Sequence, residues 1–293
     1  MTAVARPLIP VPCILCKVEG TPTDIAENGF ALRRCPSCGL LFVSPRPEDD
    51  DIQAIYEHDA AHTAARQILA KSRDPEAVAH ARHTLRLVRP YQPGGDLLEI
   101  GAGAGIFLNE ARRAGYRIAA IEPNPLQASF MKETFGIDCV AAPFKPETLG
   151  NAAFDVVYHC NVLSHFSNPV EALALIRRHL RPGGVLVMET GNFADVHPRF
   201  HPLIVRTERF QLPDHLFFFG HRSLRLLLEQ TGFTLRALHR HSRVAEKVAL
   251  PLLRKMRLGR VAGRLGFFLT YRLGRRLPKS GRPQTVIVIA STT

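Results

Sequence analysis

The chain has 293 residues, 46% of them hydrophobic, which is enough for a main domain with an accessory module. A membrane-spanning helix needs about 20 apolar residues, and no apolar run in the sequence is that long. We expect no signal peptide, because the N-terminus lacks an apolar core. A formal net charge of +12 favours an anionic substrate, partner or surface, although many basic enzymes share this property.

The first 47 residues contain little apolar material and are punctuated by proline, glycine and cysteine. Four of the six cysteines form two C-x2-C motifs, Cys13 with Cys16 and Cys35 with Cys38. Such pairs favour metal binding over disulfides in a reducing cytoplasm, which is the compartment we expect. We predict a zinc-ribbon-like module over residues 1–47, with a structural Zn²⁺ because protein ligands fill all four positions. The alternative is a redox-active or unliganded set of cysteines.

Residues 48–94 have a helical composition and are predicted to form a linker or cap, with a helix that ends at Pro90. From residue 95 to the C-terminus, apolar segments alternate with helical ones. Strands are predicted at 96–100, 116–122, 137–142, 154–161 and 183–190, and helices at 105–115, 126–136 and 169–180. This alternation predicts an α/β fold with a parallel, doubly wound, Rossmann-like sheet.

The alternating pattern stops after Thr190 for about thirty residues. A connection of that length is usually functional, so we expect residues 191–222 to form a substrate lid. Residues 233–241 and 284–291 are predicted to be further strands. Between them, residues 242–282 form a basic insertion with apolar residues at helical spacing. It is expected to pack as helices, with contact to an anionic membrane surface or to nucleic acid as alternatives.

The stretch LLEIGAGAG, residues 97–105, places three glycines at alternate positions behind the first of these strands. Glycine tolerates positive φ and lets the backbone approach a ligand closely. Dinucleotide sites use the spacing G-x-G-x-x-G, whereas here the spacing is G-x-G-x-G and Glu99 stands two residues ahead. A carboxylate at this place would repel a pyrophosphate, but it suits a ligand that carries an amino-acid group.

Glu122 ends the next predicted strand, where an acidic side chain can accept both hydrogens of a ribose diol. A ligand with a ribose, a cationic head and no phosphate is S-adenosylmethionine. The alternatives are a nucleotide-sugar or NAD site, or a degenerate Rossmann domain that binds nothing.

Four motifs, in this order and spacing, resemble class I S-adenosylmethionine-dependent methyltransferases: LLEIGAGAG, AAIEPNP, FDVVYHCNVLSHFSNP and LRPGGVLVMET. The resemblance is to the branch with ubiquinone-biosynthesis-like and sugar-modifying enzymes, and it covers roughly residues 96–233. The N-terminal module is similar to that of some deoxysugar C-methyltransferases and polysaccharide-cluster methyltransferases. It is also similar to that of ribosomal RNA guanine methyltransferases with an N-terminal zinc site. These two similarities imply different substrates.

The resemblance implies a set of cofactor-binding residues. The glycine loop would hold the methionine end, Glu122 the ribose, and the end of the fourth strand would lie near the reacting methyl group. Many members place an acidic or amide residue after the third strand for adenine, but this chain has AAPFKPETL there, which leaves the backbone or Phe144. The implied residues are Glu99, Gly101, Ala102, Gly103, Gly105, Glu122, Pro123, Phe144, Cys160, Asn161 and Val162. By themselves, Cys139 and Cys160 resemble small core residues.

Methyl transfer from a sulfonium needs an aligned acceptor and, for a hydroxyl acceptor, removal of a proton. His215 in LPDHLFFF belongs to the irregular segment, which we expect at the carboxyl edge of the sheet, where open α/β folds bind ligands. With Asp214 beside it and Phe217–Phe219 after it, we hypothesise that His215 is the general base of a partly apolar acceptor pocket. The alternative is a histidine that packs the loop. His165, just beyond the fourth strand, is expected to position its loop or to act in catalysis.

These features favour a methyltransferase for a small-molecule acceptor such as a sugar nucleotide, glycan or lipid-linked precursor, with His197 and His201 as further candidate contacts. The protein could work at the inner face of the membrane, as a peripheral contact. An RNA methyltransferase that docks through the module and the basic insertion is the alternative, although HCNV differs from the N/D-P-P-[YF] motif of amino-methylating nucleic-acid enzymes. A third alternative is a zinc-ribbon interaction protein with a relic cofactor domain, which the intact Glu99 and Glu122 disfavour.

Overall fold

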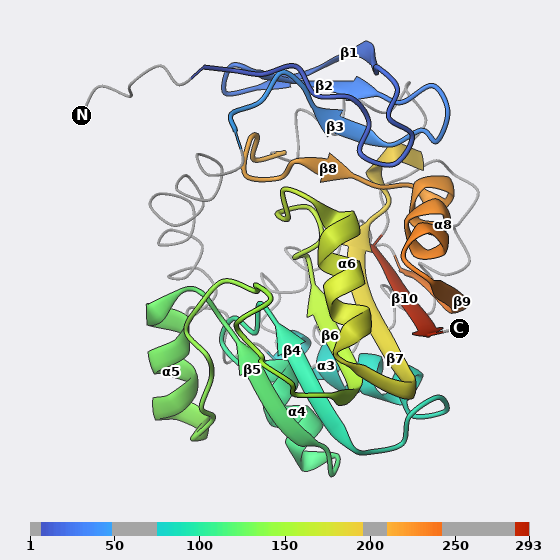
Figure 1. Cartoon of the computed structure of the whole chain (residues 1–293). Helices are drawn as coiled ribbons and strands as arrows, with labels where there is room; N and C mark the ends of the chain where they lie inside the picture. The colour runs from blue at the N-terminus through green and yellow to red at the C-terminus, as the bar shows by residue number, and fades with distance from the viewer. Residues whose placement is uncertain (1–6, 49–74, 196–209, 242–284, 293) are drawn as a thin grey trace, which may run out of the picture.

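The computed structural model of the chain describes residues 7–48, 75–195, 210–241 and 285–292. Within these ranges the chain forms a central six-stranded sheet and a four-stranded sheet that contains the N-terminal strands (Figure 1). The strand order is β5-β4-β6-β7-β10-β9 in the large sheet and β1-β2-β3-β8 in the small one.

The large sheet contains six strands: β4 (Asp96–Ile100), β5 (Arg117–Ile121), β6 (Phe154–Cys160), β7 (Leu180–Gly191), β9 (Phe233–His241) and β10 (Thr285–Thr292). β4 pairs in parallel with β5 and β6, and β6 pairs in parallel with β7, which confirms the predicted parallel sheet for these strands. β10 is the exception, because it lies antiparallel between β7 and β9. The carboxyl ends of the four parallel strands therefore meet at one edge, where open α/β sheets bind ligands.

The strand predicted at residues 137–142 does not form. Val140 makes an isolated parallel bridge to Ile121 instead of a ladder. Gly136 ends the preceding helix in the left-handed conformation, and Pro143 has no N–H to donate. Few residues are left between them to extend the pairing.

Helices cover both faces of the large sheet, as the doubly wound prediction requires (Figure 1). The helices α3 (Pro75–Val88), α4 (Ile106–Arg113) and α5 (Pro125–Phe135) share one apolar cluster, and α6 (Pro169–Arg178) and α8 (His221–Gln230) belong to another. Asn124 and Asn168 cap α5 and α6, because each side-chain oxygen accepts hydrogen bonds from the first turn. Of the helices in the described ranges, none is long and apolar enough to cross a membrane.

The small sheet combines the N-terminal module with a strand from much later in the chain. The module supplies β1 (Thr21–Glu27), β2 (Phe30–Arg34) and β3 (Leu41–Val43), and β8 (Phe217–Phe218) pairs antiparallel with β3. The segment 191–222, predicted to be irregular, thus contains β8, the short 3₁₀ helix η2 (Phe193–Asp195) and the start of α8. Residues 196–209 of this segment lie outside the described residues.

One hydrophobic core joins the module to the large sheet. Leu32 and Phe42 of the module belong to one buried cluster that also contains Ile100 of β4, Leu227 of α8, and Phe219, which precedes α8. The module and the sheet therefore share an interior and pack as one body.

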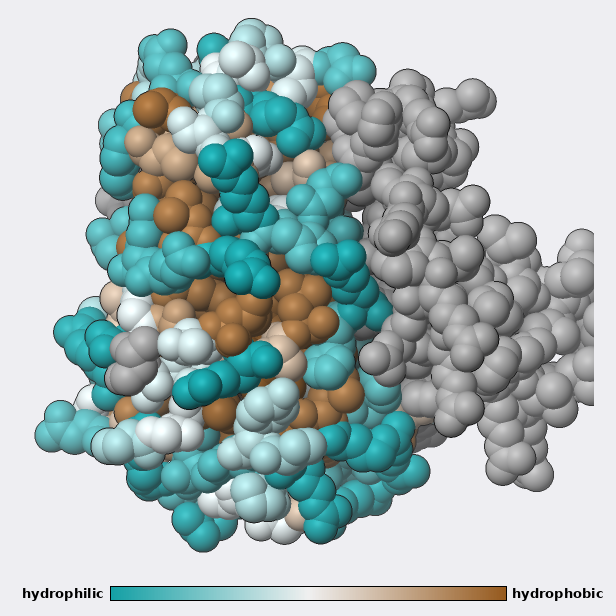
Figure 2. Space-filling model, turned by 90° about the vertical axis from the view of Figure 1, so that its right-hand side faces the viewer, coloured by the Kyte–Doolittle hydropathy of each residue, from teal (hydrophilic) through white to brown (hydrophobic). Residues whose placement is uncertain are grey.

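Figure 2 shows apolar side chains between hydrophilic ones at mid-height of one face, so apolar surface is exposed there.

Candidate active site

The glycine loop lies between the carboxyl end of β4 and the start of α4. Gly101, Gly103 and Gly105 have φ values of 70°, 55° and 74°, a region that other residues rarely adopt. A Cβ atom on Gly101 would lie 2.6 Å from the Cγ2 atom of Val162, so the loop following β6 packs directly against this turn. The N–H groups of Gly101 and Ala102 donate to the carbonyl of Ile121, at 2.9 and 3.1 Å. The loop is thereby fixed against β5.

Glu99 points into the buried face of β4 beneath this loop. Its side chain is 4% exposed, and its Oε2 atom has no hydrogen-bond partner among the described residues. Burial raises the pKa of this carboxyl well above its ordinary value, and the neighbouring Glu122 and Glu189 raise it further. A hydrogen bond from the backbone N–H of Leu108 opposes this rise only in part. A cationic ligand would offset the remaining cost of desolvating the charged form.

Glu122 follows the last residue of β5 and is 4% exposed. Its Oε2 accepts the N–H of Gly103 at 2.7 Å, and its Oε1 accepts that of Asn124 at 2.8 Å. Burial raises its pKa, and these two hydrogen bonds oppose the rise. Each oxygen retains a lone pair for a hydroxyl donor. Pro123, beside it, is half-buried.

The remaining cofactor residues predicted from the resemblance lie at the carboxyl end of β6, with one exception. Cys160 is the last residue of β6, and Asn161 adopts a φ of 55° while its N–H donates to the carbonyl of Glu189 at 2.9 Å. Phe144 lies instead beside Phe166, with ring centroids 6.3 Å apart. Its contact with adenine stays a prediction.

A buried polar cluster around Glu189 of β7 was not predicted. Glu189 is 1% exposed, and its Oε1 accepts hydrogen bonds from Tyr158 and Thr84, both at 2.9 Å. Its Oε2 lies 2.7 Å from Nε2 of His80 on α3. The Tyr158 ring also stacks on Phe107 of α4, with centroids 3.7 Å apart. The one signal in the sequence is an acidic residue within the apolar strand GGVLVMET.

The two candidate catalytic histidines lie next to each other, with ring centroids 4.4 Å apart. The Nδ1 atom of His215 lies 2.9 Å from the carbonyl oxygen of Phe210, so it must carry the proton and leaves Nε2 basic in the neutral ring. The Nδ1 atom of His165 lies 3.0 Å from the carbonyl oxygen of Asp214 and 3.3 Å from its carboxylate. The structure therefore brings His165 together with Asp214 and His215, which follow it by 49 and 50 residues in the sequence.

Burial lowers the pKa of His215 to about 4, and the neighbouring His165 contributes in the same direction, while Asp214 opposes it. His215 is thus neutral at ordinary pH. Burial tends to raise the pKa of Asp214, but the hydrogen bond and charge of His165 and the charge of His215 outweigh it, so its pKa is lowered. The carboxylate of Asp214 is therefore ionised beside a neutral imidazole.

The three phenylalanines after His215 have different environments. Phe218 is half-buried and packs edge-on against Phe210 and Phe193, with centroids 5.4 and 5.8 Å away. Its ring also lies 6.1 Å from that of His215. Phe217 and Phe219 are instead buried in the core shared with the module. Phe218 is thus the member of the three whose ring contacts that of His215.

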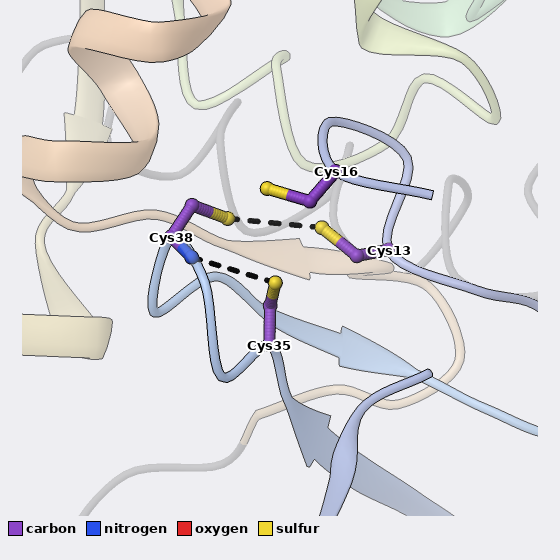
Figure 3. A group of neighbouring side chains, drawn as sticks. All are labelled: Cys13, Cys16, Cys35 and Cys38. Atoms are coloured by element: carbon purple, nitrogen blue, oxygen red, sulfur yellow. Dashed lines mark hydrogen bonds between the residues drawn. The ribbon is translucent and has the colours of Figure 1, made fainter. Parts of the chain in front are cut away.

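The four cysteines of the module converge on one point (Figure 3). Their Sγ atoms all lie within 4.8 Å of one another, and those of Cys13 and Cys38 are 3.7 Å apart. Four sulfurs at about 2.3 Å from Zn²⁺ stand about 3.8 Å from each other, so the cluster fits a tetrahedral site. Both turns also share one backbone form, since Lys17 and Gly39, each directly after its pair, have φ of 59° and 77°.

Several sequence predictions fall outside the described residues. They are His197 and His201, the candidate acceptor contacts, and the basic insertion at 242–282 with its predicted membrane or nucleic-acid contact.

A family model described as a methyltransferase domain matches residues 59–238, more than half of the chain. The chain therefore belongs to this methyltransferase family, which confirms the resemblance seen in its motifs. It carries the Rossmann-like domain of S-adenosylmethionine-dependent methyltransferases, with the glycine loop and both glutamates at the expected edge of the sheet.

Two relatives show where the similarity is concentrated. The tRNA U34 carboxymethyltransferase of Pseudoalteromonas translucida is 31% identical over 157 residues, which are 50% of this chain and 48% of that protein. The ubiquinone biosynthesis O-methyltransferase of Caulobacter vibrioides is 33% identical over 102 residues, which are 33% of this chain and 40% of that protein. The chain spans about half the length, or less, of these curated relatives.

A solved structure resembles the chain over nearly its whole length. The Burkholderia thailandensis 1,6-didemethyltoxoflavin-N1-methyltransferase, with bound 1,6-didemethyltoxoflavin and S-adenosylhomocysteine, aligns with a TM-score of 0.55 over 93% of this chain and 99% of that one. Its sequence is 17% identical, so the likeness concerns the fold.

Proposed function

We propose that the protein transfers a methyl group from S-adenosylmethionine to a small-molecule acceptor, such as a sugar nucleotide, glycan or lipid-linked precursor, with His215 as the base. The observation that carries this proposal is the half-buried His215 ring, held by the carbonyl of Phe210 and packed beside Phe218. A basic nitrogen next to aromatic side chains suits a compact acceptor that has both apolar and polar parts.

On the donor side, Glu99 would hold the ammonium group of the methionine end and Glu122 would accept the ribose hydroxyls. The unpartnered oxygen of Glu99 supports this assignment, because the ammonium would compensate a buried charge. The N-terminus of α4, which begins directly after the glycine loop, would offer N–H groups to the methionine carboxylate. When bound, S-adenosylmethionine supplies an activated methyl group on a positively charged sulfur.

On the acceptor side, Nε2 of neutral His215 would take the proton of an acceptor hydroxyl. The acceptor oxygen forms a bond to the methyl carbon as the carbon–sulfur bond breaks, and the sulfonium becomes a neutral thioether. The hydrogen bond from Nδ1 to Phe210 holds the ring in the tautomer this needs. The ionised Asp214, next to His215 in the chain, would stabilise the resulting imidazolium.

We also propose that the four module cysteines bind one structural Zn²⁺. Their spacing and the matching turn geometry support it, and the four protein ligands leave no place for a substrate. Metal analysis of the purified chain should give about one Zn²⁺ per molecule, and Cys35→Ser should lower this value. A chain that folds and contains no metal would contradict the assignment.

The test of His215 is the variant His215→Asn, whose side-chain amide can still donate to the carbonyl of Phe210. We expect turnover to fall about 10²–10⁴-fold, the usual contribution of a general base. The affinity for S-adenosylmethionine, measured by calorimetry, should stay within about threefold, because the donor residues lie on other strands. Unchanged turnover in this variant would remove His215 as the base.

A second candidate is methylation of RNA, which the similarity to a tRNA U34 carboxymethyltransferase and the net charge of +12 favour. The two candidates differ in how binding depends on salt, since RNA affinity falls steeply as phosphate counterions are released. Filter binding of total tRNA at increasing salt, beside assays with labelled donor on sugar nucleotides, phenolic quinone precursors and tRNA, separates them. Label in tRNA but in no small molecule would reverse our order of preference.

A further inference from the structure

The cysteine site is built into the hairpin that receives β8. Cys35 directly follows β2, and Cys38 lies three residues before β3 begins at Leu41. The N–H of Cys35 donates to the carbonyl of Leu40 at 2.8 Å, and Cys38 donates through its N–H to Sγ of Cys35. Two of the four proposed metal ligands therefore lie in the turn between β2 and β3, so their geometry sets where β3 lies.

β3 in turn holds the segment that carries the base. Phe217 and Phe218 pair with β3, and the N–H of Val43 donates to the carbonyl of Leu216 at 3.0 Å. Leu216 directly follows His215, and its own N–H donates to the carbonyl of Ser164 at 2.8 Å. Because Ser164 precedes His165, both histidines are attached through backbone hydrogen bonds to the end of β3.

A second contact reaches the same segment from the tip of the β1–β2 hairpin. The side-chain amide of Asn28 donates to the carbonyl of Leu212 at 2.8 Å, across 184 residues of sequence. Leu212 lies two residues before Asp214. Arg46, just past β3, adds a hydrogen bond to the carbonyl of Ser167 and lies over the Phe217 ring at 5.7 Å.

The donor side is held differently. Gly101 and Ala102 donate to Ile121, and Gly103 donates to Glu122, all within the large sheet and its first turn. The two halves of the site therefore have different hydrogen-bond anchors, although the loop after β6 contacts both, through Val162 against Gly101 and through Ser164 to Leu216.

We propose that the metal-bound module is a positioning element of the acceptor side: it holds the Asp214–His215 segment through β3 and Asn28, while the donor side keeps its own hydrogen bonds within the large sheet. The inference rests on the proposed function, because it takes the cysteines as metal ligands and His215 as the base. Metal occupancy and the Asn28 contact should therefore control turnover while the donor affinity stays constant.

Hydrogen exchange on the full chain with donor bound tests the metal part directly. Removing the metal with a chelator should speed exchange about tenfold or more at the amides of Val43 and Leu216. The amides of Gly101 and Ala102 should stay within about twofold of their rates in the metal-bound chain. Equal acceleration at both pairs, or none at Val43 and Leu216 when metal is gone, would overturn the proposal.

Asn28→Gly tests the positioning contact without touching the metal. Asn28 has a φ of 54°, which glycine adopts without strain, so the variant removes the side chain alone. We expect about a tenfold lower turnover and a displaced acid limb of the pH profile, with metal content and donor affinity unchanged. The control is Thr21→Ala, which removes an exposed hydrogen bond to Arg34 inside the same module. Asn28→Gly with the turnover and pH profile of the control would count against the proposal.

The outcomes separate this inference from the function beneath it. A chain that binds no S-adenosylmethionine fails the proposed function, and a chain without metal fails the zinc assignment. Intact donor and metal binding, with turnover insensitive to Asn28, fails the positioning role alone.

Discussion

The proposed donor and acceptor sides of the site are assembled from different kinds of contact. Glu99, the glycine loop and Glu122 belong to one continuous strand–helix–strand segment, residues 96–122. His165 and His215 come from separate segments that meet only in the fold, and the strand that follows His215 pairs with the N-terminal module. Local geometry therefore fixes the donor side, whereas long-range packing fixes the acceptor side. A local substitution should disturb one side and spare the other.

The largest effect that would separate the two sides is expected from Glu99→Gln. The variant keeps the shape of the side chain and removes its charge, so the donor ammonium loses a charge-assisted contact of about 1.5–3 kcal/mol. The dissociation constant for S-adenosylmethionine should rise about 10–100-fold in calorimetry. The control is Glu110→Gln on α4, where the carboxylate is also buried but is paired with Arg82 of α3 and Arg113 of α4; it should bind the donor normally. Equal affinities in both variants would refute a donor role for Glu99.

A buried histidine in β6, the strand between the two sides, should lower the stability of the fold at low pH. His159 is fully buried opposite Ile100 and Met188, and its ring nitrogens have no hydrogen-bond partner in the described part of the chain. Burial lowers its pKa to about 4, below the unfolded value of about 6.5. The unfolded chain therefore binds more protons between these values, and stability must fall as the pH falls.

The corresponding variant is His159→Leu, measured by urea unfolding at pH 7 and pH 5. Between pH 7 and pH 5, protonation of His159 in the unfolded state should lower the unfolding free energy of the unmodified protein by about 2 kcal/mol. The variant should not show this loss. As a control, His179→Leu removes a hydrogen bond to the carbonyl of Ala152 and should destabilise at both pH values. Identical pH dependence in parent and His159→Leu would show that His159 does not titrate in this way.

The pH dependence of donor binding should sharpen the comparison further. The pKa of Glu99 in the free protein is raised, first by burial, so acidification neutralises the carboxyl before the cation can pair with it. Affinity for S-adenosylmethionine should fall about tenfold per pH unit below that pKa, with proton release on binding. Calorimetry in buffers of different ionisation enthalpy measures both. A pH-independent affinity between pH 5 and 8 would mean that Glu99 is already ionised when the donor arrives.

The smallest effect is expected from Tyr158→Phe. The hydroxyl of Tyr158 donates to Glu189, whose Oε1 keeps the hydrogen bond from Thr84 when the tyrosine is replaced. We expect a loss of about 1 kcal/mol in the free energy of unfolding. Tyr116→Phe, which loses a hydrogen bond to the carbonyl of Gln92, should cost a similar amount. A loss several times larger in Tyr158→Phe would show that the whole Glu189 cluster had come apart.

Sequence reasoning could place the residues of the proposed donor side at one turn because its signals are local. Three alternating glycines, a glutamate ahead of them and another after the next strand fix both geometry and chemistry within one segment. The same reasoning failed at residues 137–142, where apolar composition predicted a strand but a left-handed glycine and a proline limit the pairing. It also gave no expectation of the Glu189 cluster, whose partners on α3 and β6 are distant in sequence.

The structure brings the predicted acceptor residues close together, but the sequence did not show how they are held there, and their role in catalysis stays a prediction. His165, Asp214 and His215 were named from their places in the chain, and their proximity could not be read from spacing. A run of three phenylalanines predicted one apolar wall, yet alternation along β8 directs Phe218 to the histidine pair while Phe217 is buried with the core. Strand pairing over such a separation leaves no local signal in the sequence.

The strand β8 also sets a limit on how the protein can be dissected. A shortened chain that starts after residue 47 would lack β3, the strand that pairs with β8, and would expose Phe217 and Phe219 to solvent. Bare strand edges flanked by aromatic rings invite self-association, so such a fragment should precipitate instead of behaving as a minimal catalytic unit.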